Sequence, residues 1–499
     1  MVDSLSALFM GIDVNSENVT VALLDYKGDI VTQVASGYKI DVVKPGWTEQ
    51  NPAIWWEALV NACSTLKQRT DLTKVQCIAL TGQMHTTVVL DKHGQVLVNA
   101  LLWNDQRSSS SALELEQMVG TTRIKEITGN IMMPAFTAAK LQWFKINRPE
   151  IFHRIGHVLI AKDYLRYCLT GEMAIDVSDA SGTGLFAVQQ RTWSDELIQA
   201  FGFDRSWFPE ALDSSSVSGL ITKNTAHLLG LKAGTPVIAG AGDNAIASIA
   251  AGIFTAKQGL LRIGSAGSVI ITTDEPQIFR YNVQSVSSLH NFCHALSNLW
   301  YSMGNTLSAE LSLHWLYDAL AVYSPDEGAW QKLVSEILNV RTTDDWLIFL
   351  PYLGGERTPH IDSKARGVFF GLNFRHDIRH MALAVMEGVA FSQRDCLNVL
   401  RQVNLNVNHF KMIGEITRHP IWCQILADIL DVPLSVPYYQ NSAQGAALMA
   451  GLAFGMYDYT LIAEHQSTAD YYPNAAWKSY YDRIYITYQE LYKSVAHLY

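Results

Sequence analysis

The sequence predicts an α/β protein with two similarly folded lobes around a central cleft. Its 499 residues are several times the length of a typical domain, which favours two large domains. Up to residue 82 the chain reads as strand, strand, strand, helix, strand, and the same order returns after residue 258. A segment dense in alanine and glycine, near 245–257, separates the two copies. We therefore expect one lobe over 1–250 and a second over 251–499.

The first lobe opens with a predicted antiparallel meander. Runs such as VTVALLDY are β-rich, and DYKGDI supplies a hairpin turn containing Gly28. A helix is expected to start at Asn51-Pro52, because proline suits the first helical turn. A short apolar strand ending in glycine follows. The predicted strands are 8–14, 19–26, 29–39 and 75–82. Such an opening is unlike the βαβ start of a dinucleotide-binding fold.

The second lobe repeats this plan with longer insertions. Residues 258–276 predict a strand, a tight turn and a strand, and 299–308 predict a third strand that leads into a helix. Two further buried strands are expected within 344–355 and 409–416, and a helix over 418–429. Because both halves of the chain follow the same order of elements, we expect two lobes of similar fold that face each other.

Composition restricts the function classes. A net charge of −10 argues against a nucleic-acid binder, and no apolar run reaches the roughly 18 residues that span a bilayer. The N-terminus lacks the basic segment and cleavage site of a signal peptide, so we read it as the lead-in to the first strand. The six cysteines show no zinc-ligand spacing and predict free thiols in a reducing compartment. Together these features predict a cytoplasmic enzyme without membrane or nucleic-acid partners.

Two polar segments follow predicted strands of the first lobe. Asp13 ends the first strand, where a carboxylate can hold Mg²⁺ and the following turn can offer N–H groups to a phosphate; a surface aspartate in a turn is the alternative. Gln83, Met84 and His85 follow the strand 75–82, at the edge where open sheets place ligands. His85 could equally be a structural histidine.

Three further segments are candidates. Trp103 to Arg107, including Asp105, break an apolar run with polar groups that suit a polyol. Asp243 and Asn244 begin an alanine-rich helix, so that Asp243 is either a helix cap or a carboxylate able to accept a proton from a hydroxyl. The turn Gly264-Ser265-Ala266-Gly267 could be a second phosphate cradle, although many hairpins look alike.

These segments, in this order, resemble the FGGY family of carbohydrate kinases, and within it the xylulose kinases. The resemblance covers nearly the whole chain and rests on GWTEQNPAIWW, GQMH, LLWNDQR, KDYLRYCLTGE, SDASGT, GDNA and PYLGGERTPH. It implies an actin-like, ribonuclease H-like fold and phosphorylation of a sugar hydroxyl by ATP with Mg²⁺. The first lobe is then the sugar-binding lobe and the second the nucleotide-binding lobe, and a homodimer is a possible state.

The resemblance also assigns roles to residues. Asp243 is implied as the general base, Asp13 and Asp243 as the carboxylates near the metal, and Met84 and His85 as sugar contacts. Asn244 and Asp105 are implied on the same sugar-facing surface. The residues implied on the nucleotide side are Asp13, Ser16, Gly264, Ser265, Gly267, Gly414 and Gly445. The implied reaction converts D-xylulose to D-xylulose 5-phosphate by in-line transfer.

The sequence departs from the family pattern on the nucleotide side. Asn15 and Ser16 stand where the family has glycine and threonine, and Glu17 adds a negative charge. Of a later glycine run only Gly414 remains, followed by Glu415. We therefore favour a working kinase with altered nucleotide binding over a catalytically impaired sugar-binding homologue. A kinase for another ketose or polyol stays open, because Thr86 and Thr87 follow His85 where the family more often has a small residue.

Overall fold

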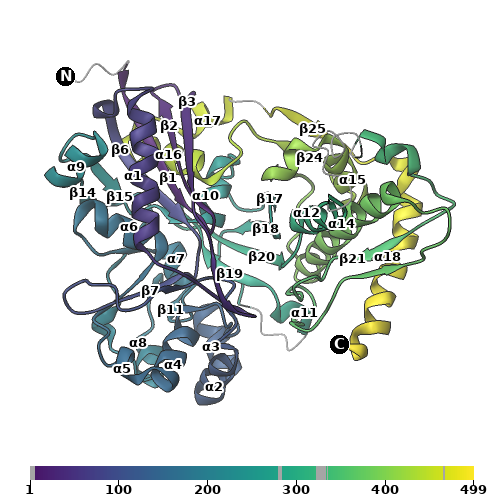
Figure 1. Ribbon diagram of the computed structural model, residues 1–499, viewed down its shortest axis with the longest axis horizontal. Coiled ribbons are helices and arrows are strands. Elements are labelled where there is room, and N and C mark those ends of the chain that lie inside the picture. Colours follow the sequence, from purple (N-terminus) through teal and green to yellow (C-terminus); the bar gives the residue numbers. More distant parts are fainter. Residues whose placement is uncertain (1–5, 279–283, 322–332, 334, 465–466) are drawn as a thin grey trace.

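The computed structural model describes residues 6–278, 284–321, 333, 335–464 and 467–499, so the predicted lead-in over 1–5 lies outside the described residues. The first lobe is built on a seven-stranded sheet in the order β14-β15-β6-β1-β2-β3, with β16 also paired to β6 (Figure 1). Its strands are β1 (Leu8–Val14), β2 (Asn18–Asp25), β3 (Ile30–Gly37), β6 (Val75–Gly82), β14 (Val217–Leu220), β15 (Pro236–Ile238) and β16 (Ala241–Gly242). β1, β2 and β3 pair antiparallel, which confirms the predicted meander, and β6 pairs with β1 in parallel.

The second lobe repeats that topology. Its seven-stranded sheet has the order β19-β20-β18-β17-β23-β24-β25. The strands are β17 (Gly259–Ile263), β18 (Gly267–Thr273), β19 (His290–Cys293), β20 (Trp300–Thr306), β23 (Phe410–Ile413), β24 (Leu434–Val436) and β25 (Ala469–Tyr471). β17 pairs antiparallel with β18 and parallel with β23, which matches β1 with β2 and β6. The edge strand β19 has no counterpart in the sheet of the first lobe.

Amphipathic helices cover both sheets. In the first lobe α1 (Ala53–Lys67) packs on β2 and β3, and α6 (Ala161–Thr170) packs on β6. In the second lobe α14 (Ile378–Gln402) lies along β20 and β18 and packs against α12 (Glu310–Ala321) and α15 (Pro420–Leu430). α18 (Ala475–Val495) covers the far side of α15. One face of α14 is buried along most of the helix, so α14 is part of the core of this lobe.

Smaller elements complete the molecule. The first lobe carries a five-stranded sheet of β4 (Asp41–Lys44), β5 (Trp47–Gln50), β7 (Thr87–Leu90), β8 (Ala100–Leu101) and β9 (His157–Ile160). Its other helices are α2 (Ser109–Val119), α3 (Thr121–Thr128), α4 (Thr137–Asn147), α5 (Pro149–Phe152), α7 (Val177–Ser181), α8 (Asp195–Ala200) and α9 (Lys223–Leu229). The remaining short elements are β10 (Ile175–Asp176), β11 (Phe186–Ala187), β12 (Thr192–Trp193), β13 (Ala211–Leu212), α11 (Gln284–Ser287) and α17 (Tyr459–Glu464).

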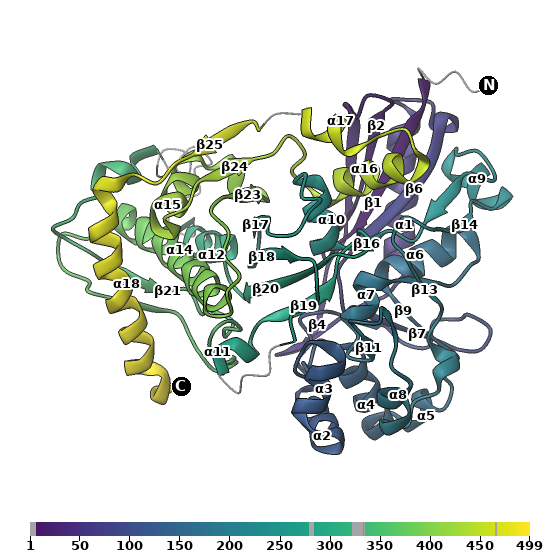
Figure 2. The same cartoon turned by 180° about the vertical axis from the view of Figure 1, so that it is seen from behind.

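A segment from the second half of the chain returns to the first lobe. Helix α16 (Ser442–Phe454) lies against β1 and β6, beside α10 (Asp243–Ala250) (Figure 2). A Cβ on Gly11 of β1 would stand 1.9 Å from the Ala443 carbonyl oxygen, so only glycine permits this approach. The Tyr439 hydroxyl donates to the Gly28 carbonyl at 2.8 Å. The boundary at residue 250 stays a prediction, since α16 packs across it.

The predicted strand within 344–355 is much shorter than expected. Only β21 (Ile348–Leu350) is extended, and it pairs with β22 (Val368–Phe370) outside the main sheet. Pro351 follows directly and cannot donate a ladder hydrogen bond, which ends the strand. All six cysteines are unpaired, as predicted. Among the described residues, no helix combines the length and apolarity needed to traverse a bilayer.

Candidate active site

An ion pair between the two lobes marks the candidate site. Asp243 is the first residue of α10, directly after β16, and a helix N-terminus favours a carboxylate there. Its Oδ2 accepts a hydrogen bond at 2.7 Å from Nη1 of Arg262, which lies on β17 of the second lobe. The same nitrogen donates to Asn244 Oδ1 at 2.9 Å. The side chains of Arg262 and Asp243 stay 31% and 21% exposed, so the pair is accessible to a ligand.

Asp13 lies near this pair with an unsatisfied oxygen. Its Oδ1 is buried and has no hydrogen-bond partner among the described residues. Burial, followed by the negative charge of Asp243, raises the Asp13 pKa to about 7, and Arg262 partly offsets that rise. A desolvated carboxylate oxygen close to a second carboxylate suits a hard divalent cation such as Mg²⁺, which takes oxygen ligands. The residues therefore fit the predicted metal.

The turn after β1 does not present the predicted phosphate cradle. The Asn15 side-chain oxygen accepts from the backbone N–H groups of Glu17 and Asn18, both at 2.9 Å, so those donors are already used. The Ser16 hydroxyl donates to Gln83 Oε1 at 3.0 Å and accepts from Trp103 Nε1 at 2.9 Å. Ser16 was predicted on the nucleotide side, but its hydroxyl is engaged by residues of the first lobe.

Met84 and Asn244 meet beside the ion pair. Asn244 Nδ2 donates to the Met84 sulfur at 3.9 Å, and the Tyr301 hydroxyl donates to the same sulfur at 3.7 Å. Tyr301 comes from β20, so both lobes contribute to this wall. The structure thus brings Met84 and Asn244 together with Asp243, as the sequence predicted for one surface.

His85 sits at the edge of the same wall in a strained conformation. Its φ of 67° lies in the left-handed region, which costs energy for a non-glycine residue. Its Nδ1 lies 2.8 Å from the Gly182 carbonyl oxygen and therefore carries the proton of that hydrogen bond. Burial lowers the His85 pKa to about 3, so the ring is neutral and Nε2 is an acceptor. Such a ring can accept a hydrogen bond from a sugar hydroxyl across the physiological pH range.

Asp105 is not brought to this site. Its side chain is fully buried, and its oxygens accept hydrogen bonds from the Arg107 guanidinium at 2.9–3.0 Å and from the Thr48 N–H at 2.7 Å. A carboxylate with both oxygens used in this way has none left for a sugar. The polar side chains of the 103–107 segment include a buried ion pair between Asp105 and Arg107. The spacing of polar residues in a sequence does not distinguish such a pair from a binding surface.

The predicted nucleotide-side glycines divide into two groups. Gly264, Ser265 and Gly267 form the turn between β17 and β18, and the space beside Gly264 is open to at least 4 Å. Gly414 directly follows β23 with φ of 109°, and a Cβ there would meet the Ile263 carbonyl oxygen at 2.1 Å. These residues lie together at the ends of three neighbouring strands.

Gly445 belongs to the other group. A Cβ on it would stand 2.6 Å from the Ile246 carbonyl oxygen of α10. Gly445 is therefore a position of close helix packing between α16 and α10, and the structure does not place it at the strand ends with Gly414. Its signal in the sequence, a Gly-Ala-Ala helix start, is equally typical of tight helix–helix contact.

A buried charge network, to which the sequence analysis gave no role, supports Asp243. Lys162 Nζ lies 2.5 Å from Asp163, 2.8 Å from Asp176 and 3.2 Å from Asp179, all fully buried. Asp179 Oδ1 would be 3.0 Å from a Cβ on Gly242, the residue before Asp243. The segments KDYLRYCLTGE and SDASGT, which carry all of these charges except Asp176, contact the start of α10, where the Gly242 N–H donates to the Ser178 hydroxyl at 2.9 Å.

Two residues of the second lobe were also missed. Arg262 is a lone cation in the apolar strand LLRIG, which was a usable signal. Arg357 lies in the segment PYLGGERTPH, and its guanidinium stands 5.7 Å from the Trp103 ring. Its positive charge lowers the His85 pKa, an effect smaller than the lowering caused by burial. It brings a positive charge to the side of the site formed by the first lobe.

The comparisons with known proteins agree along the whole chain. Models of the N-terminal and C-terminal domains of the FGGY family of carbohydrate kinases match residues 8–250 and 260–454. A xylulose kinase of Lactococcus lactis is 33% identical over 98% of this chain and 97% of its own length. One from Escherichia coli is 36% identical over 89% and 90%, and a gluconokinase of Bacillus subtilis is 25% identical over 91% and 89%.

A solved structure agrees as well. The crystal structure described as a "xyloylose kinase" from Brucella ovis is 33% identical, has a TM-score of 0.89, and covers 99% of this chain and 100% of that one. The match confirms the predicted two-lobed, actin-like α/β fold.

Proposed function

Since the chain belongs to the FGGY family of carbohydrate kinases and is an ATP-dependent sugar kinase, we propose that its substrate is D-xylulose and its product D-xylulose 5-phosphate. The observation that carries the proposal is the Asp243–Arg262 pair between the lobes, with Met84 and Asn244 beside it. This arrangement puts a proton acceptor next to a wall able to bind a small polar ligand. The names of the relatives favour a ketose as that ligand.

In the proposed mechanism Asp243 is the general base. The sugar O–H bond breaks, its proton goes to the Asp243 carboxylate, and the hydroxyl oxygen attacks the γ-phosphorus of ATP as the bond to the leaving ADP breaks. Arg262 contacts Oδ2, and the described residues supply no hydrogen bond to Oδ1. We assign Oδ1 to the proton transfer, which typically contributes about 10²–10⁴ in rate.

Asp13 would hold the metal. Its buried, unpartnered Oδ1 is the ligand we assign to Mg²⁺. When bound, the ion would neutralise phosphate charge, which is most of what phosphoryl transfer requires of a site. Asp243 is assigned to the same metal-facing side, and the turn 264–267 to the phosphates.

The sugar is assigned to the wall made by Met84, His85 and Asn244. The neutral His85 ring accepts from a hydroxyl, while Asn244, held by Arg262, orients a second one. Asp105 is left out of this assignment because its oxygens are occupied. ATP dependence and six unpaired thiols favour a cytoplasmic location, and a homodimer stays a prediction.

A second candidate function is phosphorylation of a different sugar derivative. The similarity to a gluconokinase over 91% of the chain favours this alternative, because that relative, 25% identical to this chain, is named for a different substrate. Impaired catalysis is the third outcome to test, because Asn15 occupies two backbone donors of the first turn.

The decisive experiment is an ADP-release assay with Mg-ATP and a panel of D-xylulose, other ketoses, polyols and D-gluconate. We expect turnover highest with D-xylulose, and a loss of about 10²–10⁴ in kcat for Asp243→Asn. Asp195→Asn is the matched control, since that side chain is 86% exposed. Full activity of Asp243→Asn would exclude the base assignment, and absence of turnover across the panel would exclude a working kinase.

A further inference from the structure

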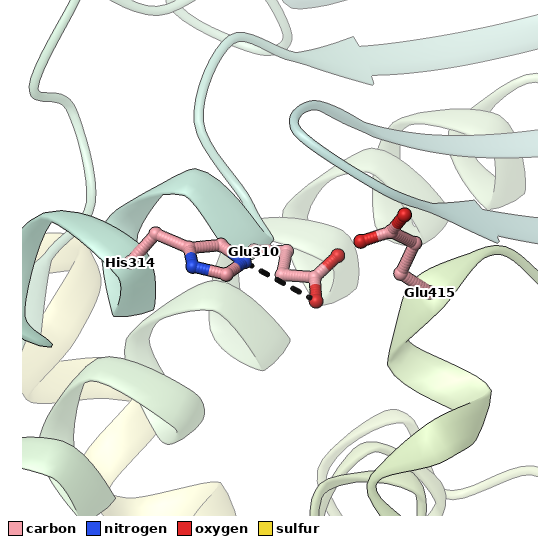
Figure 3. Close-up of side chains that lie close together, drawn as sticks. All are labelled: Glu310, His314 and Glu415. Carbon is pink, nitrogen blue, oxygen red and sulfur yellow. Dashed lines mark ion pairs between the residues drawn. The ribbon is translucent and has the colours of Figure 1, made fainter. Parts of the chain in front are cut away.

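A cluster of carboxylates and imidazoles lies on the second lobe, outside the Asp243 site. Glu310 and His314 come from one face of α12, at i and i+4, and Glu415 comes from the 3-10 helix η5 (Glu415–Arg418) opposite (Figure 3). Their ligand atoms all lie within 4.8 Å of one another. His419 adds a second imidazole, with Nε2 3.8 Å from Glu310 Oε1. Three potential metal ligands therefore converge from two segments, and a fourth lies next to Glu310.

The central side chain of this cluster is buried, and two imidazoles lie at ion-pair distance from its carboxylate without hydrogen-bonding it. Glu310 is only 5% exposed, and no described residue donates a hydrogen bond to its carboxylate within 3.5 Å. The two nearest groups, the Nε2 atoms of His314 and His419, stand 3.6 and 3.8 Å from its Oε1, which is too long for a hydrogen bond. A buried carboxylate in this state needs a cation or a proton to balance it.

These separations suit ligands of one ion. Two atoms bound tetrahedrally at ~2.0–2.1 Å from a metal stand about 3.3 Å apart, so the observed 3.6 and 3.8 Å need only small side-chain rotations. Figure 3 shows the carboxylates of Glu310 and Glu415 turned toward each other from their two segments. The burial of Glu310 and the charge of Glu415 raise the Glu310 pKa to about 6, so its ionised form is available at neutral pH.

The donor set indicates which ion. Mg²⁺ and Ca²⁺ prefer oxygen ligands alone, whereas a mixture of imidazole and carboxylate suits Zn²⁺ and its first-row neighbours. Arg418 lies near enough to lower the Glu310 pKa, which opposes cation binding, but two carboxylates outweigh this one charge. We propose that this cluster binds one divalent transition-metal ion of the Zn²⁺ class through the carboxylates of Glu310 and Glu415 and the imidazole of His314, with the imidazole of His419, which lies beside Glu310, rotating in as a fourth ligand.

The site joins two segments on the predicted nucleotide side, the turn 264–267 and the end of β23. The Glu310 N–H donates to the Gly264 carbonyl at 3.0 Å, so α12 starts on the turn between β17 and β18. Glu415 directly follows Gly414 at the end of β23. An ion bridging α12 and η5 would therefore close the space between them to a base or ribose. This second part, that metal and adenosine exclude each other, rests on the proposed function.

The metal site is tested on the full chain after treatment with a chelator and its removal. We expect calorimetry with ZnCl₂ to give one site per chain, and CoCl₂ to give the intense visible absorption of a tetrahedral site. His314→Ala and Glu415→Gln should each weaken Zn²⁺ binding at least about tenfold, a loss of about 1.4 kcal/mol. His93→Ala, an exposed histidine elsewhere, should change nothing. Binding unaffected by both cluster variants, or no binding at all, would overturn the site.

The coupling is tested with adenosine, which lacks the phosphates that chelate metals. We expect Zn²⁺, at a concentration just sufficient to fill the wild-type site, to weaken adenosine binding to the wild type and to have a much smaller effect on the Glu415→Gln variant, whose site is then mostly empty. Equal adenosine affinity with and without Zn²⁺ would overturn the coupling and leave the metal site standing. The Co²⁺ absorption does not depend on catalysis, so failure of the kinase assay and failure of this site are distinguishable.

Discussion

Replacing Asp13 with asparagine should stabilise the metal-free protein while abolishing catalysis. The Asp13 pKa is raised from 3.8 to about 7, chiefly by burial, so its charged form is disfavoured in the folded chain. A shift of about three units corresponds to roughly 4 kcal/mol at 1.36 kcal/mol per unit. Because Asp13 as a whole is only partly buried, we expect about half of that, ~2 kcal/mol, to be measurable.

The sign follows from the direction of the shift. A carboxyl whose folded pKa is raised binds its proton more tightly in the folded state, so the wild type loses stability as pH rises from about 4 to about 7. Asp13→Asn cannot lose that proton. Its advantage should therefore be complete above pH 7, fall to about 1 kcal/mol near pH 5, and vanish near pH 4.

The assay is urea unfolding of both proteins in EDTA at pH 8 and pH 5. Asp195→Asn serves as the exposed control and should track the wild type at both values. Adding Mg²⁺ at pH 8 should stabilise the wild type more than Asp13→Asn, since the ion balances the charged carboxylate. An advantage of equal size at both pH values, or a variant less stable at pH 8, would refute the idea that a desolvated, unpartnered carboxylate stands at this position.

Three further predictions concern packing, the buried ion pair and the nucleotide wall. Gly11→Ala should lower the unfolding free energy by about 1–3 kcal/mol or more, because the new Cβ would meet backbone at 1.9 Å. Gly264→Ala is the control and should change the unfolding free energy by less than about 0.5 kcal/mol, since the space beside Gly264 is open. Equal effects of the two substitutions in calorimetry would contradict the placement of α16. Asp105→Asn should destabilise the chain by about 3–5 kcal/mol with an unchanged sugar KM, and a raised KM at wild-type stability would return Asp105 to the sugar site. Glu415→Gly should tighten adenosine binding about fivefold, roughly 1 kcal/mol, in calorimetry of metal-free protein, because it removes the charged side chain that follows Gly414 on the predicted nucleotide side; weaker binding would mean that adenosine does not lie beside Glu415.

The sequence by itself determined the main strands and the places in them where the candidate site residues stand. Short apolar, β-rich runs bounded by turn residues placed β1, β2, β3 and β6, because strand propensity and turn chemistry act over a few residues. The same local logic put Asp13 at a strand end and Asp243 at a helix start. The motifs added the family, and through it the pairing of Met84 with Asn244.

Only the tertiary structure decided which polar groups meet. Arg262 donates a hydrogen bond to Asp243 from the other lobe. The oxygens of Asp105 accept hydrogen bonds from Arg107 and Thr48, and Gly445 allows close packing of two helices. Glu310 and Glu415 are far apart along the chain and come together because β17 and β23 are neighbours in one sheet. Local patterns carry no information about such encounters: they depend on how whole sheets and helices pack, and that packing decides whether a charged side chain is a ligand, a partner or a structural support.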